Sequence, residues 1–271
     1  MRKTILITGT SSGLGRATAM RFQREGWNVI ATMRSPGQES ELTRLDNVLV
    51  TRLDVQDPDS IHAAVSAGIA RFGRIDALVN NAGYGAYGPL EATPVEKIRR
   101  QFDVNVLGLL ATTQAVLPHL RAQGSGVIVN VSSMGGRMAF PLGALYHGTK
   151  FAVEGISESL QYELAPLGIA VKVVEPGFMH TDFAGRSLDI SNDEDIEAYQ
   201  PLVRSLMGAL GELSANGTGP EVAAGVVYQA VLDDSPRLRY AAGADAERML
   251  AGREQASDAD FFTGVRTQFG L

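Results

Sequence analysis

The chain has 271 residues, of which 45% are hydrophobic and 20% charged, a balance typical of a folded globular protein. Its formal net charge of −6 leaves no basic surplus to replace the counterions of a nucleic acid, so we expect no nucleic-acid partner. The absence of cysteine excludes disulfides, thiolate metal sites and a cysteine nucleophile. The apolar run near the N-terminus is too short for a signal peptide, and no stretch is long enough to span a bilayer. We therefore expect a cytoplasmic protein without a membrane partner.

Short β-branched runs alternate with longer amphipathic segments along the first two thirds of the chain. The runs are continuously apolar, as expected for parallel strands that helices cover on both faces. The predicted strands cover residues 4–8, 28–32, 47–53, 77–80, 126–132 and 170–176, and the helix-like segments cover residues 14–26, 58–73, 94–123 and 146–168. This alternation predicts a three-layer α/β fold with a doubly wound parallel sheet of the Rossmann type.

The pattern breaks down between residues 183 and 219, where the sequence is rich in Gly and Ser and acidic in its middle. Long irregular segments inside compact domains are usually lids over a site or disordered segments. A helix over 220–232, a short strand over 237–243 and a helical tail are expected after it. No linker composition indicates a second domain, so we expect one domain with a cofactor core over about 1–182, a substrate lid over about 183–219 and a C-terminal part over 220–271.

Three glycines, Gly9, Gly13 and Gly15, lie between the first predicted strand and the first predicted helix. Glycine permits a positive φ and lets the backbone approach a pyrophosphate closely, while the helix directs its N–H groups at the phosphates. A glycine-rich turn without a ligand is the alternative, but the position directly after the first strand favours a dinucleotide site. The spacing is G-x3-G-x-G rather than the common G-x-G-x-x-G.

This spacing is one of five motifs that occur in a characteristic order. The others are "NNAG" (80–83), "NVSS" (130–133), "YHGTK" (146–150) and "PGFMHT" (176–181). Together they resemble the short-chain dehydrogenase/reductase family, in its compact single-domain branch, from about residue 3 to residue 183. The resemblance implies a nicotinamide-dependent oxidoreductase with the catalytic residues Asn105, Ser133, Tyr146 and Lys150. Ser133 is chosen over Ser132 because it lies 13 residues before Tyr146, the usual spacing in the family.

These residue types suit proton transfer at a carbonyl oxygen. A tyrosine with a pKa of about 10 is a poor base at neutral pH. Lys150 lies one helical turn from Tyr146, and its ammonium, like a positively charged nicotinamide, would lower that pKa. Ser133 is expected to hydrogen-bond the substrate oxygen. The resemblance implies that Asn105 holds a water behind Lys150. Purely structural roles for these side chains are the alternative.

The cofactor preference depends on the end of the second predicted strand. Met33 occupies the position where NAD-preferring relatives usually have Asp, and the guanidinium of Arg34 suits the 2′-phosphate of NADP. This favours NADP(H) over NAD(H), although Ser12 replaces a basic residue common in NADP-using relatives and Arg34 could be a solvated surface residue. The cofactor contacts implied by the resemblance are Gly9, Ser11, Ser12, Gly13, Leu14, Gly15, Arg34, Asp54, Val55, Asn81, Ala82, Gly83, Tyr146, Lys150, Pro176, Gly177, Met179 and Thr181.

The residues near the expected substrate pocket are largely apolar. They include Met134, Phe140, Phe178 and Phe183, with Tyr84 and Tyr87 as further candidates, although such residues are more often core than pocket. An apolar pocket under a lid fits a medium-sized lipophilic ketone, aldehyde or secondary alcohol. The four histidines show no metal-ligand spacing, so no metal is expected, and His147 is interpreted as a bystander to the chemistry.

The leading hypothesis is an NADP(H)-dependent carbonyl reductase or alcohol dehydrogenase. An NAD-dependent alcohol dehydrogenase and a non-enzymatic NAD(P)H-binding regulator on the same fold are the alternatives. A sugar epimerase or dehydratase of the longer branch is disfavoured by the glycine spacing and the short C-terminal region. Because relatives commonly associate through their two long helices, we expect a homodimer or homotetramer.

Overall fold

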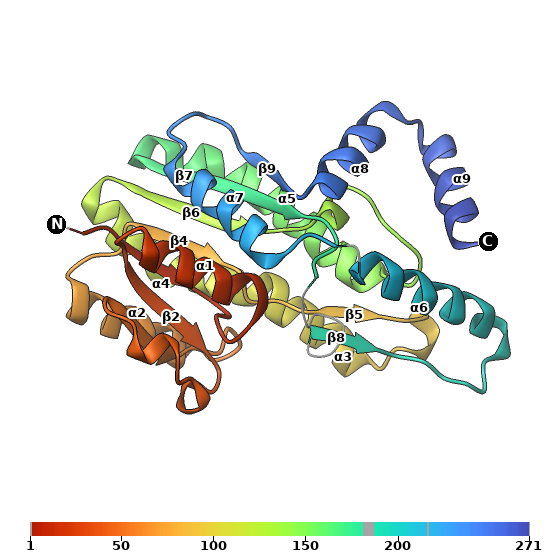
Figure 1. Ribbon diagram of the computed structural model, residues 1–271, viewed down its shortest axis with the longest axis horizontal. Helices are drawn as coiled ribbons and strands as arrows, with labels where there is room; N and C mark the ends of the chain where they lie inside the picture. Colours follow the sequence, from red (N-terminus) through yellow and green to blue (C-terminus); the bar gives the residue numbers. More distant parts are fainter. Residues whose placement is uncertain (1, 181–186, 216, 271) are drawn as a thin grey trace.

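The computed structural model describes residues 2–180, 187–215 and 217–270. Within these residues, seven parallel strands form one central sheet in the order β3-β2-β1-β4-β6-β7-β9 (Figure 1). The strands are β1 (Thr4–Ile7), β2 (Asn28–Met33), β3 (Val48–Arg52), β4 (Ala77–Asn80), β6 (Gly126–Val131), β7 (Ile169–Pro176) and β9 (Arg239–Ala242). The order reverses between β1 and β4, which is the topological switch point of a doubly wound sheet. The predicted fold and its seven strands are confirmed.

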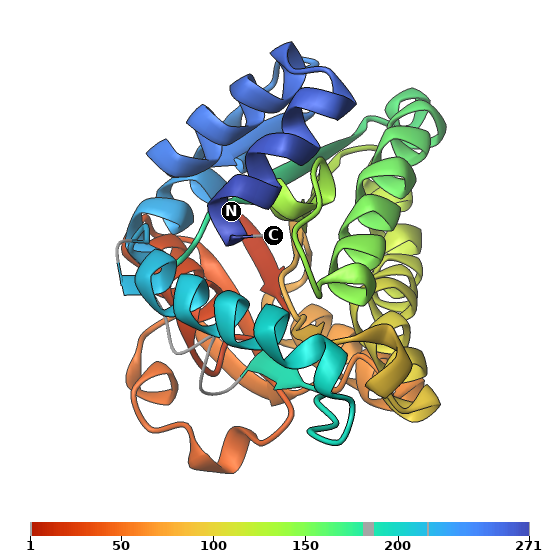
Figure 2. The same cartoon turned by 90° about the vertical axis from the view of Figure 1, so that its right-hand side faces the viewer.

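Helices cover both faces of the sheet and complete a three-layer structure (Figures 1 and 2). One face packs against α1 (Gly13–Arg24) and α7 (Pro220–Leu232), and the other against α2 (Pro58–Phe72), α4 (Gly108–Gln123) and α5 (Ala144–Leu164). Short 3₁₀ turns lie between these elements: η1 (Pro36–Gln38), η2 (Leu42–Arg44), η3 (Leu90–Ala92), η5 (Met134–Gly136) and η6 (Ala165–Leu167). Burial on both faces explains why the strands are apolar without alternation.

The helical segment predicted over 94–123 contains an irregularity that its sequence does not indicate. It consists of α3 (Val95–Phe102), a π-helical turn η4 (Asp103–Leu107) and α4, which follow one another directly. Such π turns insert one residue into a helix and occur often at functional sites. This one contains Asn105.

The expectation of irregular structure over 183–219 is wrong for the described part of that segment. It contains β8 (Leu188–Ile190), a 3₁₀ turn η8 (Glu197–Tyr199) and the long helix α6 (Gln200–Ala215). Strand β8 pairs in parallel with β5 (Gly85–Tyr87), about a hundred residues earlier in the chain. The two strands form a separate small sheet. Because they lie far apart in the sequence, no local pattern predicts that they pair.

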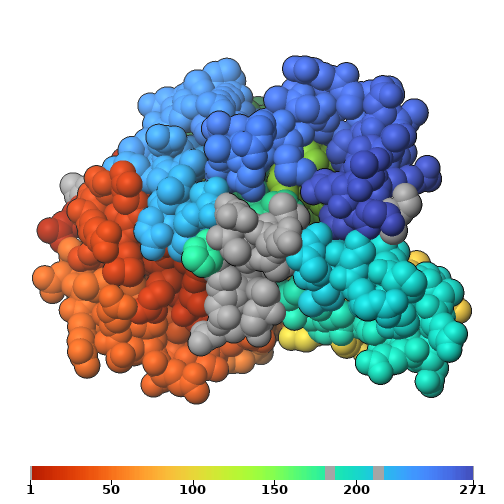
Figure 3. All heavy atoms as spheres, turned by 45° about the vertical axis from the view of Figure 1, so that its right-hand side comes forward, coloured from red at the N-terminus to blue at the C-terminus, as the bar shows by residue number. Residues whose placement is uncertain are grey.

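The predicted helical tail is two helices, α8 (Ala244–Gln255) and α9 (Asp258–Phe269). Helix α9 returns to α6, and the two lie side by side in Figures 2 and 3. The hydroxyl of Ser205 in α6 donates to the carbonyl oxygen of Phe269 at 2.5 Å. The ring of Phe269 lies 6.3 Å from that of Phe140, centroid to centroid. The division into core, lid and tail remains a prediction.

Candidate active site

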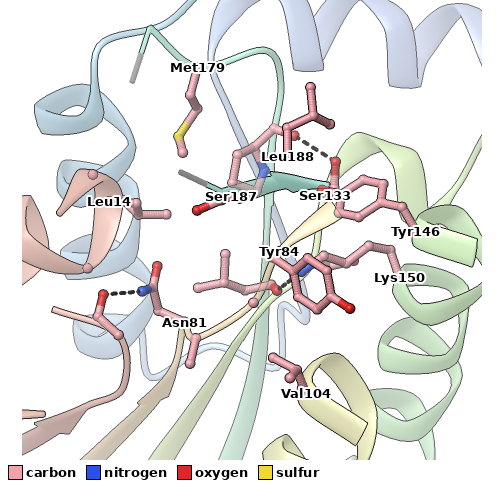
Figure 4. A pocket seen from close by; sticks show the side chains of 18 of the residues that line it. Leu14, Asn81, Tyr84, Val104, Ser133, Tyr146, Lys150, Met179, Ser187 and Leu188 are labelled. Carbon is pink, nitrogen blue, oxygen red and sulfur yellow. Dashed lines mark hydrogen bonds between the residues drawn. The ribbon is translucent and has the colours of Figure 1, made fainter. Parts of the chain in front are cut away.

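A cavity of about 580 Å³ opens at the carboxyl ends of the main-sheet strands (Figure 4). Open α/β sheets bind their ligands at this edge, beside the switch point. The sequence-predicted residues that line the cavity are Gly9, Ser11, Ser12, Gly13, Leu14, Gly15, Arg34, Asp54, Val55, Asn81, Ala82, Gly83, Ser133, Met134, Phe140, Tyr146, Lys150, Pro176, Gly177, Phe178 and Met179, together with the further candidates Tyr84 and Tyr87. Thr181 and Phe183 lie outside the described residues. Asn105 does not line the cavity.

The glycine turn after β1 has the geometry that a pyrophosphate requires. Gly9 and Gly13 have φ angles of 72° and 53°, in the left-handed region that favours glycine. A Cβ atom on Gly15 would lie 2.2 Å from the carbonyl oxygen of Gly9, so a larger residue does not fit there. Ser12 provides no side-chain cap, and within the described chain no group accepts from the N–H groups of Gly13, Leu14 and Gly15. These residues fit a dinucleotide cofactor.

The "NNAG" segment holds this turn in place. The side-chain amide of Asn81 donates to the carbonyl oxygens of Thr8, at 2.9 Å, and Gly9, at 3.1 Å. The hydroxyl of Thr8 accepts from the backbone N–H groups of Asn81 and Ala82, both at 3.0 Å. The loops after β1 and β4 are therefore locked together beneath the predicted pyrophosphate position.

Ser133, Tyr146 and Lys150 meet at the opposite end of the cavity (Figure 4). Ser133 follows β6, and the other two lie one turn apart on α5. The Ser133 hydroxyl is hydrogen-bonded to Tyr146 and accepts from the backbone N–H of Gly135 at 3.0 Å. The Lys150 Nζ atom donates to the carbonyl oxygen of Val131 at 2.9 Å and lies 5.8 Å from the ring centroid of Tyr146.

The protonation of this group differs in one respect from the sequence prediction. Burial raises the pKa of Tyr146, and the hydrogen bond with Ser133 only partly opposes that rise. Burial also lowers the pKa of Lys150 to about 8, against the opposing charge of Glu154. The expected lowering of the Tyr146 pKa is therefore not present in this arrangement, because desolvation of the phenolate dominates and the Lys150 ammonium turns toward Val131.

Asn105 does not face the cavity but supports its wall through hydrogen bonds to Tyr84 and Thr149. Its Oδ1 atom accepts from the backbone N–H of Tyr84 at 3.1 Å. Its Nδ2 atom donates to the Tyr84 carbonyl at 2.9 Å and to the Thr149 hydroxyl at 3.1 Å. Asn105 thus connects the π turn to α5 next to Lys150. The water that the resemblance implies there stays a prediction.

His147 fixes the loop above Tyr146. Its Nε2 atom accepts from the backbone N–H of Phe140 at 3.1 Å, and its Nδ1 atom lies 2.9 Å from the carbonyl oxygen of Gly135. The ring must therefore be neutral, with its proton on Nδ1, and burial lowers its pKa. His147 also lines the cavity, and its interpretation as a bystander to the chemistry stays a prediction.

The predicted substrate residues differ in how they contribute to the cavity. The rings of Phe140 and Phe178 lie 6.4 Å apart, centroid to centroid, and both line the cavity. Met134 also reaches it but is only 3% exposed and packs in a core cluster with Met138 and Leu250. Met134 is thus mainly a core residue.

Several cavity residues come from segments that sequence reasoning did not connect with the site. The segment predicted to be a lid contributes Leu188, Asp189 and Ile190, and the helical segment before α4 contributes Arg100 and Val104. The composition of a lid is the signal for the first three, which reach the site through the long-range pairing of β5 with β8. Nothing in the sequence indicates Arg100 and Val104.

Asp245, in the first turn of α8, is a further residue that the sequence does not indicate. Its Oδ2 atom accepts from the backbone N–H of Phe178 at 2.7 Å. A Cβ atom on Gly177 would lie 2.2 Å from the same oxygen, which explains the glycine of the "PGF" loop. Asp245 thereby positions one wall of the cavity from about 70 residues away.

The described residues offer neither a cluster of metal-ligating side chains nor a membrane-spanning helix. No group of three or more His, Asp or Glu side chains there could hold a metal ion. No helix there is both long and apolar enough to cross a membrane.

Comparison with known proteins gives a family and several relatives. The family model for short chain dehydrogenases matches residues 3–192. An uncharacterised oxidoreductase of Schizosaccharomyces pombe is 44% identical over 239 residues, which are 88% of this chain and 100% of the relative. The 3-ketodihydrosphingosine reductase of Bacteroides thetaiotaomicron is 35% identical, covering 88% and 87% of the two chains. Human 17-beta-hydroxysteroid dehydrogenase type 1 is 34% identical, covering 88% and 77%.

Solved structures agree with this comparison. A short-chain dehydrogenase from Streptomyces avermitilis superposes with a TM-score of 0.83 at 34% identity, covering 99% of this chain and 96% of the other. ElxO with NADP bound has a TM-score of 0.73 at 27% identity, covering 89% and 98%. A short-chain dehydrogenase/reductase from Burkholderia phymatum in complex with NAD has a TM-score of 0.78 at 25% identity, covering 96% and 95%.

Proposed function

The chain belongs to the short-chain dehydrogenase/reductase family, and on that premise we propose that it uses NADP(H) to interconvert a lipophilic ketone or aldehyde and its alcohol. It is an oxidoreductase of this family. The observation that supports the reaction best is the convergence of Ser133, Tyr146 and Lys150 on one end of a cavity that has the glycine turn at its other end. Both halves of a hydride-transfer site thus share one space.

In the proposed reaction, Ser133, Tyr146 and Lys150 each have a separate role. When bound, the nicotinamide supplies or accepts the hydride. In reduction, the Tyr146 hydroxyl donates its proton to the carbonyl oxygen, and in oxidation the same oxygen takes the proton from the alcohol. The Ser133 hydroxyl holds the substrate oxygen by a hydrogen bond. The Lys150 ammonium stabilises the phenolate left on Tyr146. The raised Tyr146 pKa keeps that proton in place at neutral pH, which favours the role of acid.

The preference for NADP(H) is supported by the surroundings of Arg34, which differ from those of Arg16 on α1. Arg16 is engaged by Glu39, at 2.6 Å, and by Glu41, at 2.5 Å. Arg34 lines the cavity, is exposed, and has no carboxylate within 4 Å among the described residues. Its guanidinium is available for a 2′-phosphate, and the neighbouring Met33 lacks the carboxylate that would repel one.

A lipophilic substrate is supported by the aromatic and aliphatic walls beside Tyr146. Tyr87, Phe140, Phe178, Leu188 and Ile190 line that part of the cavity. Two of the similar proteins are named for a long-chain base ketone and for a steroid. We also propose that the protein is a cytoplasmic homodimer or homotetramer.

The test is a panel of lipophilic ketones, aldehydes and secondary alcohols, assayed with NADPH, NADH and their oxidised forms. We expect Tyr146→Phe to lower kcat by about a thousandfold for every substrate found, because it removes the proton donor. NADPH binding, measured by fluorescence titration, should persist. The matched control is Tyr162→Phe, since Tyr162 lies on the same helix but is 81% exposed, and it should keep parental turnover.

Near-parental kcat in Tyr146→Phe would contradict the assignment of the proton donor. Tight NADPH binding without turnover of any substrate would favour the cofactor-binding regulator instead.

A further inference from the structure

A buried ionic cluster lies behind the candidate active site. Glu154 on α5 and Glu175 on β7 are 4% and 3% exposed. Arg239, from β9, places its Nε atom 2.9 Å from Glu154 Oε2 and 3.9 Å from Glu175 Oε1. Arg137, which follows η5, lies 3.6 Å from Glu175 Oε1. Two carboxylates and two guanidinium groups from four separate elements thus meet beneath the cavity floor.

Glu154 contacts the segments that contain the proposed catalytic residues. It lies one helical turn after Lys150 on α5, on the same face of the helix. A Cβ atom on Gly136 would lie 3.0 Å from Glu154 Cγ, 3.0 Å from the Lys150 carbonyl oxygen and 2.6 Å from the Ser132 hydroxyl. The side chain of Glu154 and the backbone of Lys150 therefore pack against Gly136, which also lies against Ser132, the residue that precedes Ser133.

Some buried oxygen atoms of the cluster have no hydrogen-bond partner among the described residues, so the carboxylate charges can act on groups several ångströms away. Glu154 Oε1, Glu175 Oε1 and the Ser132 hydroxyl are all buried and have no hydrogen-bond partner among the described residues. In a low-dielectric interior the field of an incompletely compensated carboxylate is strong over several ångströms. Lys150, 8% exposed, has only the Val131 carbonyl oxygen on its ammonium, with no carboxylate within 4 Å in the described part of the chain.

We propose that Glu154 is a positioning residue that keeps Lys150 protonated in the working pH range, acting through space rather than through a direct ion pair. Lys150 can then stabilise the phenolate of Tyr146 in each turnover. The inference rests on the proposed function, because it gives Lys150 the role assigned there.

The electrostatics of the cluster agree with this role. Burial lowers the pKa of Lys150 to about 8, and Glu154 is the group that opposes it. Burial, with the charge of Glu154, raises the pKa of Glu175 to about 7. At pH 7 Glu175 is therefore about half protonated, so part of its negative charge remains beside Arg239. The charged groups around the pair are Lys150 and Glu158 on α5, Arg239 on β9, Arg137 after η5 and Glu254 on α8.

The experiment compares Glu154→Gln with Glu158→Gln. Glu158 binds the same Arg239, at 2.5 Å, but is largely exposed and lies one turn further from Lys150, so its loss perturbs the arginine without removing the buried charge. The pH profile of kcat/KM for carbonyl reduction is measured for the parent and both variants. We expect the alkaline limb of Glu154→Gln to move down by about one pH unit. Rates at pH 6 should stay near parental, and Glu158→Gln should follow the parent.

A second measurement reports the Lys150 protonation without turnover. The chain has four lysines, Lys3, Lys97, Lys150 and Lys172, so ¹³Cε-labelled lysine gives four NMR signals that Lys→Arg substitutions assign. The Lys150 signal should titrate about one pH unit lower in Glu154→Gln than in the parent. Glu154→Met also removes the charge, and it leaves no buried amide that needs hydrogen-bond partners. It should give the same shift of the Lys150 titration, and it replaces the Gln variant in the experiment if that variant fails to fold.

An unchanged Lys150 titration in a folded Glu154 variant overturns the inference, as does an equal shift in Glu158→Gln. A protein that shows the Lys150 shift but reduces no carbonyl would support the coupling and contradict the proposed function, so the two failures are distinguishable.

Discussion

Burial acts in opposite directions on the two titratable side chains that face the proposed substrate. It raises the pKa of Tyr146 and lowers that of Lys150, because in each case the charged form loses hydration. At neutral pH the phenol is protonated, and the Lys150 ammonium is half deprotonated at about pH 8. In the proposed reaction the phenol is the proton donor, and we expect the alkaline limit of activity to follow the deprotonation of Lys150.

At the residue scale, Arg34 is predicted to decide between the two nicotinamide cofactors. Arg34→Asp should lower kcat/KM with NADPH by at least about tenfold relative to NADH, equivalent to about 1.4 kcal/mol, because a carboxylate repels the 2′-phosphate and accepts from a ribose hydroxyl. Steady-state kinetics with both cofactors measure this. Arg44→Asp makes the same charge change on η2, outside the cavity lining, and should leave the ratio unchanged. An unaltered ratio in Arg34→Asp would mean that Arg34 is a solvated surface residue.

At the element scale, the lid is connected to the wall of the site by the β5–β8 pair. The Lys97 ammonium on α3 lies 2.6 Å from Asp189 Oδ1 in β8. The backbone N–H of Ser191 donates to the carbonyl oxygen of Tyr87 at 2.8 Å, and the Tyr87 ring lies 5.5 Å from that of Tyr146. Tyr87, at the end of β5, therefore contacts both Tyr146 and the segment that is predicted to be a lid.

We predict that Lys97→Met loosens the lid. A half-buried ion pair is worth about 1 kcal/mol, so KM for the carbonyl substrate should rise about fivefold, while KM for the cofactor changes little. Initial-rate kinetics with each substrate varied in turn test this. Glu91→Ala is the comparison, because it removes only the exposed bond that Glu91 accepts from the Tyr199 hydroxyl, at 3.0 Å. Equal effects of the two variants on KM for the carbonyl substrate would show that the Lys97–Asp189 ion pair does not contribute specifically to substrate binding.

At the scale of the whole molecule, α4 and α5 lie side by side and form one flank of the protein (Figure 2). Large apolar side chains are exposed on or next to these helices: Leu107 at 56%, Phe151 at 48% and Tyr162 at 81%. Large exposed apolar side chains on one flank are consistent with an interface. This surface fits the homodimer or homotetramer expected from the family.

Light scattering after size-exclusion chromatography should therefore give the mass of a dimer or tetramer. Phe151→Glu should shift the mass toward the monomer, because it places a charge in an apolar contact. Val222→Glu makes a similar change on α7, where Val222 is 59% exposed, and should leave the mass unaltered. A monomeric parent protein would refute the prediction.

Local sequence patterns were sufficient to predict the main architecture and to select the residues Ser133, Tyr146 and Lys150 for the candidate active site. Most of the main-sheet strands follow from apolar runs that are buried on both faces, although β3 and β9 are only partly buried. The glycine turn follows from the backbone angles that only glycine adopts easily. Ser133, Tyr146 and Lys150 could be selected because they lie at the end of β6 and one turn apart on α5, so short-range geometry already places them near one another. Their catalytic roles stay predictions.

Other features depended on which distant segments meet, and there the tertiary structure alone decides. The pairing of β5 with β8, the ordered helix α6 and the contact of Asp245 with the "PGF" loop each join parts of the chain that are far apart in sequence. The direction of the Tyr146 pKa also depends on burial, a property of the assembled neighbourhood rather than of the residue. Sequence by itself determined the main-sheet strands, the helices between them and the reactive groups, because these are set by short-range geometry and side-chain chemistry. The lid, the buried charges and the protonation state were decided by packing, because solvation and long-range contacts exist only once the chain has folded.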